Sequence, residues 1–189
     1  HLRKKVNDPR GVLNLVPALD GKSFVVENGA YWRVYELVEN SVCHQSADAS
    51  LLYESAVAFG RFQNQLADFP AEQLAETIPH FHDTPVRFMA FQRAVAEDAA
   101  SVSRLIQREI DFVLSREEFT RTLTDLQSAG ELPLRVTHND TKINNVLFDA
   151  ETNKALCVID LDTVMPGLSV NDFGDAIRFG ASTAAEDER

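Results

Sequence analysis

The chain has 189 residues, 44% of them hydrophobic and 25% charged, which is the composition of a globular protein and not of a disordered one. Its net charge of −11 argues against general affinity for nucleic acid or anionic membranes, because both bind basic surfaces. No apolar run reaches the roughly 18 residues of a transmembrane helix. The charged first residues, 1–11, do not resemble a signal peptide. We therefore expect a cytoplasmic protein.

The chain starts with His1 and stops in a charged segment, so we expect it to be part of a longer protein, with the acidic residues 186–188 as a frayed end. Residues 12–38 alternate apolar runs with Asp-Gly at 20–21 and Asn-Gly at 28–29. These dipeptides supply the positive φ angles of tight hairpin turns, which predicts three short strands in an antiparallel meander.

In the third of these strands, Trp32 and Tyr35 are expected to pack on the hairpin face, with a stacking platform as the alternative. After this strand the period of the apolar residues changes. Between Ser50 and Phe69 they recur at helical spacing and stop before Pro70, which predicts a helix.

Further elements follow along the chain. A loop rich in Pro, His and Phe is expected over 78–88, and helices are expected at about 95–114 and 117–129, the latter closed by Gly130. The remaining expected elements are strands around 134–136, 146–148 and 155–159 and a helix starting near Asn171 or Asp172.

This order of elements predicts an α+β protein of two lobes with the boundary within 36–45: a partial N-terminal β lobe, 1–38, and a helical lobe, 39–189. The two cysteines, Cys43 and Cys157, lie far apart in sequence. We expect both to be buried free thiols; a disulfide is the alternative.

One stretch, VTHNDTKINNVLFD at 136–149, is polar first and then strand-like. A second apolar strand ends at Asp160. A hairpin centred between residues 152 and 153 would set Asn145 opposite Asp160, with Cβ atoms about 4.5–5.5 Å apart. Asp140 would lie in the loop that precedes the first of the two strands, so three oxygen-bearing side chains would meet at one edge.

Two carboxylates and an amide oxygen form a site that suits Mg²⁺, with waters and phosphate oxygens in the other positions. Phosphoryl transfer also needs a group that positions the attacking hydroxyl and accepts its proton. We predict Asn145 and Asp160 as metal ligands, Asp140 as that base, and Lys142 as the cation beside the transferred group. The alternative is a hydrogen-bonded turn, because Asp, Asn and Thr also favour turns for local reasons.

Residues 138–145, HNDTKINN, match the H-x-D-x-x-x-x-N catalytic loop that protein kinases share with the aminoglycoside phosphotransferase/choline kinase family. VIDLD at 158–162 resembles that second family and not the D-F-G of protein kinases. The longer strings THNDTKINNVLFD and CVIDLDTVMPG, with NDFGDAIRFGA, resemble most the N-acetylhexosamine 1-kinases of the family. The resemblance is strong over 136–181.

The resemblance implies a bilobal protein-kinase-like fold, ATP and Mg²⁺ as cofactors, and a small-molecule acceptor, either a sugar or an amino alcohol. It gives Asp140 the role of base, Asn145 and Asp160 the role of Mg²⁺ ligands, and Asp172 that of a buried brace of the catalytic loop. In the hinge, 35–41, the backbone of three residues would meet adenine: Glu36, Leu37 and Val38. The oligomeric state is left open.

Other polar residues have blander interpretations. His138 is expected to hold the loop and not to shuttle protons, and Asp162 to be a solvated or hydrogen-bonded acid, with metal or substrate contact as the alternative. HFHD at 80–83 has two histidines but no third ligand nearby, so zinc is disfavoured.

The leading hypothesis is an ATP-dependent kinase that phosphorylates a sugar, plausibly at the anomeric hydroxyl of an N-acetylhexosamine. Residues 1–34 contain no Gly-rich phosphate loop, and Lys22 follows a turn and does not suit the strand lysine of kinases. A non-catalytic kinase-like module that binds a nucleotide or a partner is therefore the alternative. A metal-dependent phosphohydrolase is a third hypothesis, although such enzymes commonly use two close metals.

Overall fold

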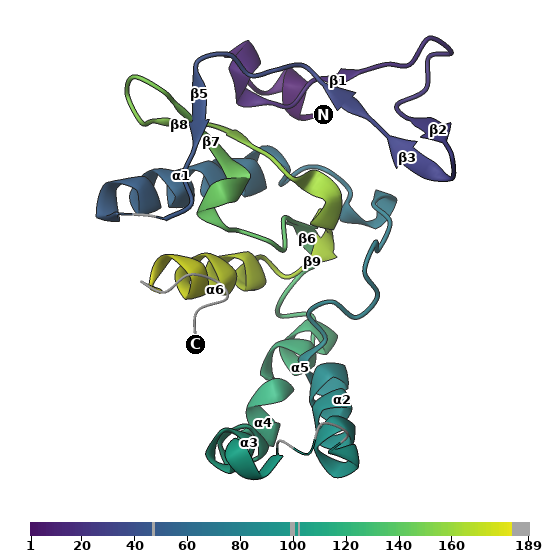
Figure 1. The fold of residues 1–189 in the computed structure, drawn as a ribbon, viewed down its shortest axis with the longest axis vertical. Helices are drawn as coiled ribbons and strands as arrows, with labels where there is room; N and C mark the ends of the chain where they lie inside the picture. The colour runs from purple at the N-terminus through teal and green to yellow at the C-terminus, as the bar shows by residue number, and fades with distance from the viewer. Residues whose placement is uncertain (47, 99–100, 102, 183–189) are drawn as a thin grey trace.

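The computed structural model describes all residues except 47, 99–100, 102 and 183–189, so the expected frayed end at 186–188 lies outside the described residues. The fold is mixed α+β, as predicted. In Figure 1 the strands lie together with α1 and α6, while α2 to α5 form a separate group at the other end of the view. The predicted lobe boundary after residue 38 falls between β4 and β5 and stays a prediction.

The N-terminal strands pair in a nested order. The strands β2 (Val25–Glu27) and β3 (Ala30–Trp32) form the predicted hairpin, with φ of 52° at Asn28 and 77° at Gly29. The strands β1 (Leu15–Val16) and β4 (Val34–Tyr35) pair with each other outside it. The predicted simple meander is therefore wrong, because the first strand does not pair with the second.

The Asp-Gly turn explains this order. The N–H of Gly21 donates to the carbonyl of Ala18, and the N–H of Lys22 donates to the carboxylate of Asp20. These hydrogen bonds stay within the turn, so it is not followed by pairing between β1 and β2. The Lys22 ammonium lies 2.9 Å from the Asp20 carboxylate, which agrees with the expectation that it is not the strand lysine.

The expected packing of the aromatic residues holds in part. Tyr35 is partly buried and lies beneath the guanidinium of Arg33, 5.6 Å from its ring centre. Trp32, by contrast, is 61% exposed, so its predicted packing on the hairpin face is wrong.

A three-stranded antiparallel sheet forms the centre of the core. Its order is β5 (Ser41–Cys43), β7 (Val146–Asp149) and β8 (Ala155–Val158), so β7 is covered on both edges and its Val146 and Phe148 are fully buried. The helix α1 (Ala49–Gln65) packs beside the sheet through Ala58 and Phe59. It confirms the predicted first helix, although it ends before Phe69.

The predicted register of the catalytic hairpin is wrong by one residue. Val146 pairs with Val158, and the N–H of Ile159 donates to the carbonyl of Asn145 at 2.9 Å. Ile159 therefore lies opposite Asn145, and Asp160 lies one residue beyond it.

The turn chemistry causes the shift. The carboxylate of Asp149 accepts from the N–H groups of Glu151 and Thr152, so the turn starts earlier than expected. A bulge between Leu147 and Phe148 then moves the pairing one residue back toward the predicted register.

The two cysteines flank the same residue of the central strand. Leu147 pairs with Cys43 on one side and with Cys157 on the other, so β5 and β8 lie two strand spacings, about 9–10 Å, apart. That separation is too large for a disulfide, and both thiols are free, as predicted. Cys157 is buried as expected, but Cys43 is exposed because it lies on an edge strand.

The helical part differs from the expectation at its start. The predicted loop 78–88 already contains the beginning of a helix, because the Asp83 side chain accepts from the N–H of Val86 and Pro85 occupies the first turn. The predicted helix at 95–114 is two helices, because Asp98 ends the first with a φ of 38°; its residues 99–100 and 102 lie outside the described ones. The bounds are α2 (Thr84–Glu97), α3 (Gln107–Leu114), α4 (Glu117–Thr120) and α5 (Thr122–Ser128).

The last elements surround the catalytic loop. The strand β6 (Arg135–Thr137) pairs antiparallel with β9 (Met165–Gly167), which was not predicted, and α6 (Ser169–Gly180) follows, two residues earlier than expected. The short 3₁₀ turns are η1 (Leu2–Lys4), η2 (Pro9–Gly11), η3 (Ala71–Gln73), η4 (Ser103–Leu105), η5 (Ile143–Asn145) and η6 (Leu161–Thr163). Among the described residues, no helix has the length and apolar character that crossing a membrane requires.

Candidate active site

The polar loop between β6 and η5 is largely buried. Thr137, His138, Asn139 and Thr141 are each at most 4% exposed, although all four are polar. Buried polar groups need hydrogen-bond partners. The hydrogen-bond partners of this loop come from α6, the segment after β8, and β9, and they explain why a loop can hold one fixed shape.

His138 holds the loop from the inside. Its Nε2 lies 2.9 Å from the carbonyl oxygen of Ile159, which can only accept, so Nε2 donates and Nδ1 accepts the N–H of Asp140 at 3.3 Å. The ring packs edge-on against Phe59 and Phe62 of α1. Because both ring nitrogens are occupied, the predicted structural role of His138 is confirmed.

Asp172 of α6 binds the backbone of the same part of the loop. Its carboxylate accepts the backbone N–H groups of His138 at 2.9 Å and Asn139 at 2.8 Å. The side-chain amide of Gln63 in α1 donates to it at 2.7 Å. The side chain of Asp172 is 2% exposed, so the expected buried brace is confirmed.

The predicted base, amide and lysine lie together. The amide nitrogen of Asn145 donates to both the side-chain oxygen and the carbonyl oxygen of Asp140, each at 2.9 Å. The ammonium of Lys142 lies 3.4 Å from the other carboxylate oxygen of Asp140. The Asp140 carboxylate is thus oriented by one amide and one cation and still reaches solvent.

Asp160 lies beside this group. It follows Ile159, whose N–H donates to the carbonyl of Asn145, and its backbone is left-handed, with φ 57° and ψ 60°. A non-glycine residue in this conformation is strained by about 1 kcal/mol or more, and such residues cluster at functional sites. The side chain is exposed at the end of β8.

The donor set fits Mg²⁺. The nitrogen of the Asn145 amide is already used on Asp140, so its oxygen is the atom left for a cation, together with the carboxylate of Asp160. Two protein oxygens suffice for Mg²⁺, which keeps several waters and binds substrate phosphates. In the described part of the chain, no three His, Cys, Asp or Glu side chains lie close enough to one another to hold a metal ion by themselves.

Asp162 is held by a residue distant in the sequence. Its carboxylate forms an ion pair with Arg33, between β3 and β4, and its carbonyl accepts from the hydroxyl of Thr77 at 3.1 Å. The interpretation of Asp162 as a hydrogen-bonded loop acid is confirmed. Arg33 could not be predicted as the partner of Asp162, because their contact depends on the fold.

The expected hinge connects β4 to β5. The N–H of Glu36 donates to the carbonyl of Asn14 at 2.8 Å, and the carbonyl of Val38 accepts from the hydroxyl of Ser41 at 2.7 Å. Leu37 between them is 86% exposed. The structure thus places the three residues in one connecting segment, and their contact with adenine stays a prediction.

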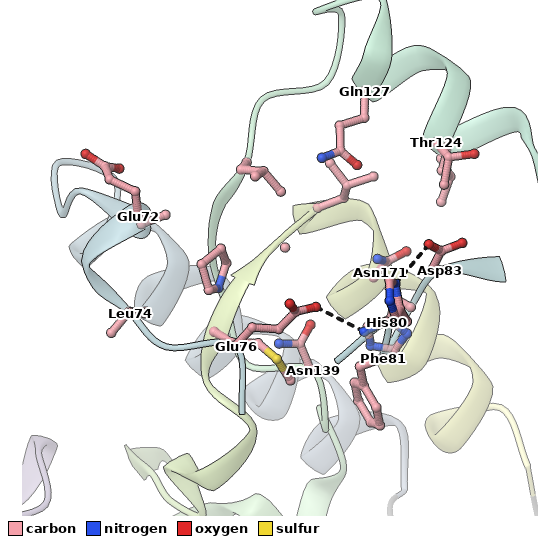
Figure 2. Close-up of a pocket in the computed structure, with 18 residues that line it drawn as sticks. Glu72, Leu74, Glu76, His80, Phe81, Asp83, Thr124, Gln127, Asn139 and Asn171 are labelled. Carbon is pink, nitrogen blue, oxygen red and sulfur yellow. Dashed lines mark hydrogen bonds and ion pairs between the residues drawn. The ribbon is translucent and has the colours of Figure 1, made fainter. Parts of the chain in front are cut away.

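A cavity of about 470 Å³ lies beside the catalytic loop (Figure 2). Residues 71–83 and α5 form two of its walls, and β9, the start of α6 and Asn139 complete it. Of the residues that line it, three carry carboxylates and none is Lys or Arg: Glu72, Glu76 and Asp83.

The two histidines of HFHD both line this cavity but have different partners. The N–H of His80 donates to Glu76 at 3.0 Å, and its ring nitrogen lies 3.4 Å from the carboxylate of Asp83 (Figure 2). Burial lowers the pKa of His82, and the backbone carbonyl of Asn139 and the acids of α6 act against this shift. His82 and Asn139 of the catalytic loop line the same cavity, which the sequence did not reveal.

Asp175 of α6 was also missed. Its carboxylate accepts the N–H of Thr141, the residue after Asp140, at 2.8 Å. The available signal was its position three residues after Asp172, on the same side of the helix.

A carboxylate held by an amide and a lysine, with further side-chain oxygens at the end of a hairpin, is compatible with phosphoryl transfer. Residues 5–189 match the family model of the phosphotransferase enzyme family, and the chain belongs to this family. Kinases of this family use ATP and Mg²⁺.

Among solved structures, a microcompartment-associated aminopropanol kinase is similar to this chain. The sequence identity is 21%, the TM-score is 0.46, and the match covers 93% of this chain and 54% of the kinase. The chain therefore spans about half the length of that protein.

Proposed function

We propose that this chain carries the catalytic centre of an ATP- and Mg²⁺-dependent small-molecule kinase that transfers the γ-phosphoryl group to a sugar hydroxyl. The observation that carries the proposal is the position of the Asp140 carboxylate, which contacts the amide of Asn145 at 2.9 Å and the ammonium of Lys142 at 3.4 Å. An oriented carboxylate that still reaches solvent can accept the proton of an acceptor hydroxyl.

Each residue of the group has a distinct role. Asn145 and Asp160 would hold Mg²⁺ through oxygen atoms, and the Asn145 amide also orients the Asp140 carboxylate. When bound, Mg²⁺ neutralises charge on the phosphate oxygens. Lys142 moves from Asp140 toward the transferred phosphoryl group, which brings a second positive charge to it.

The nucleotide would bind between the two predicted lobes, 1–38 and 39–189. The hinge residues Glu36, Leu37 and Val38 connect β4 to β5, and their position between the two parts supports backbone contact with adenine.

The cavity beside Asn139 supports a small acceptor without negative charge. About 470 Å³ is within the usual size range of small-ligand sites. Its carboxylates would repel an anionic acceptor, and they accept hydrogen bonds from hydroxyl groups. The motif resemblance is what favours the anomeric hydroxyl of an N-acetylhexosamine as the acceptor, and the cavity is compatible with it.

The experiment is a phosphorylation assay of the complete gene product with ATP and Mg²⁺. N-acetylglucosamine, N-acetylgalactosamine and choline are offered separately, and the Asp140→Asn variant is the control. A sugar 1-phosphate that forms only with the unchanged enzyme supports the proposal. Formation of phosphocholine would support the kinase activity but replace the sugar by an amino alcohol as the acceptor, because the same carboxylates suit an ammonium group.

Two further results would replace the chemistry itself. Phosphate released without any acceptor would indicate a phosphohydrolase. ATP binding without any product would favour the non-catalytic nucleotide-binding module.

A further inference from the structure

The helix α6 contacts the catalytic loop at two places, one on each side of Asp140. Before Asp140, the carboxylate of Asp172 accepts the N–H groups of His138 and Asn139. After Asp140, the carboxylate of Asp175 accepts the N–H of Thr141 at 2.8 Å.

The contact after Asp140 is a backbone contact. The Thr141 hydroxyl lies 3.2 Å from the Asp175 carboxylate but 2.8 Å from the carbonyl oxygen of Asp172. A hydroxyl has one proton, and the carbonyl is the closer acceptor. Asp175 therefore holds the loop through the backbone N–H of Thr141, and Thr141 itself is 2% exposed.

The second oxygen of Asp175 has a partner of its own. Arg178, three residues further along α6, donates to it from Nε at 3.1 Å and from Nη2 at 2.9 Å. This ion pair fixes the carboxylate on the helix surface. The Asp175 side chain is only 15% exposed, so little water competes for it.

We propose that Asp175 is a positioning residue for phosphoryl transfer, acting through Thr141 on the Asp140 carboxylate. The inference rests on the proposed role of Asp140 as the base. With Asp172 and Asp175 both in place, the backbone on either side of Asp140 is attached to one helix, and the Asp140 carboxylate keeps its place beside Asn145. A displacement of about 1 Å in such a group costs up to about 100-fold in rate.

The test compares variants of Asp175 in the complete gene product. Asp175→Ala removes the acceptor, and kcat is expected to fall about 10- to 100-fold while the KM values for ATP and acceptor change by less than about threefold. Asp175→Asn keeps one oxygen for the Thr141 N–H and is expected to recover most of kcat. Asp125→Ala, which removes an exposed carboxylate of α5, serves as the matched control.

Asp175→Glu covers the case in which the alanine variant does not fold. It keeps the charge for Arg178 but moves the carboxylate by one methylene, so it is expected to fold and to lose kcat. An alanine or glutamate variant that is folded and has the kcat of the unchanged enzyme would overturn the proposal.

Amide hydrogen exchange at Thr141 provides a second measurement that does not need activity. The proposal expects a protected amide in the unchanged protein and protection reduced at least about tenfold in Asp175→Ala. If the unchanged protein transfers no phosphate, the proposed function fails, and a protected amide would then leave Asp175 with a purely structural contact. A Thr141 amide that exchanges equally fast in both proteins would refute the contact itself.

Discussion

Replacing Asp172 by Ala should destabilise the fold strongly. The carboxylate accepts three N–H groups, two of them from the backbone of the buried residues His138 and Asn139. Each buried donor left without an acceptor costs about 1–3 kcal/mol, so the two backbone donors together cost about 2–6 kcal/mol. The total stability of a domain is only about 5–15 kcal/mol.

The prediction is measured by urea and thermal unfolding of the two proteins. At about 2–4 °C per kcal/mol for a chain of this length, a loss near 4 kcal/mol lowers Tm by about 8–16 °C. Asp172→Asn keeps one oxygen but turns an amide N–H toward a backbone N–H, so we expect about half the loss.

Asp125→Ala is the matched control, because this acid of α5 is exposed and pairs only with Arg121 at 3.7 Å. It should change the stability by less than about 0.5 kcal/mol. An Asp172→Ala variant as stable as the Asp125→Ala control would refute the reasoning that the catalytic loop depends on this carboxylate.

Three further predictions concern the hairpin and its sheet. Phe148→Ala removes a fully buried ring and should cost about 3–5 kcal/mol in urea unfolding. The guanidinium of Arg10 lowers the pKa of Asp149 to about 2. The stability that the charged Asp149 carboxylate contributes is therefore complete above the unfolded pKa of 3.8 and is lost as the pH falls toward 2. Asp149→Asn should weaken the dependence of Tm on pH between these two values. Burial raises the pKa of both thiols, that of Cys157 to about 11, but only Cys43 is exposed to a reagent. A thiol reagent should therefore add once to the native protein by mass spectrometry, and two rapid additions would contradict the structure.

The sequence predicted those elements whose formation depends on neighbouring residues in the chain. The Asn28-Gly29 turn needed only two residues with positive φ, and α1 needed only its apolar period. The loop predicted over 78–88 misses the start of α2, because Pro is common in loops. In the structure Pro85 lies in the first turn after the capping Asp83, a position in which Pro favours a helix.

Other features depend on contacts between distant segments. The strand β9 contains Pro166 and Gly167, residues that disfavour strands, and it forms because β6 offers a partner. The hairpin register could not be predicted, because the side chain of Asp149 sets the turn and a bulge follows it.

In the candidate site, too, some residues could be predicted from a local motif and others only from contacts between distant segments. The motif predicts roles for Asp140, Asn145 and Asp160, and the structure brings Asp140 and Asn145 into direct contact. Among the residues that hold the loop, only those that belong to the family motif could be predicted from the sequence, as for Asp172. Asp175 is recognised through its 2.8 Å contact with Thr141, because its position three residues after Asp172 indicates a shared helix side but no particular partner.

The most direct test of the central claim is the Asp140→Asn variant of the complete gene product. Asparagine has nearly the same shape but cannot accept the proton of the attacking hydroxyl, so turnover should fall by at least about 100-fold. ATP binding with Mg²⁺, measured by calorimetry, should stay close to that of the unchanged enzyme. Turnover near the unchanged rate would contradict the claim, because another group would then have to accept the proton.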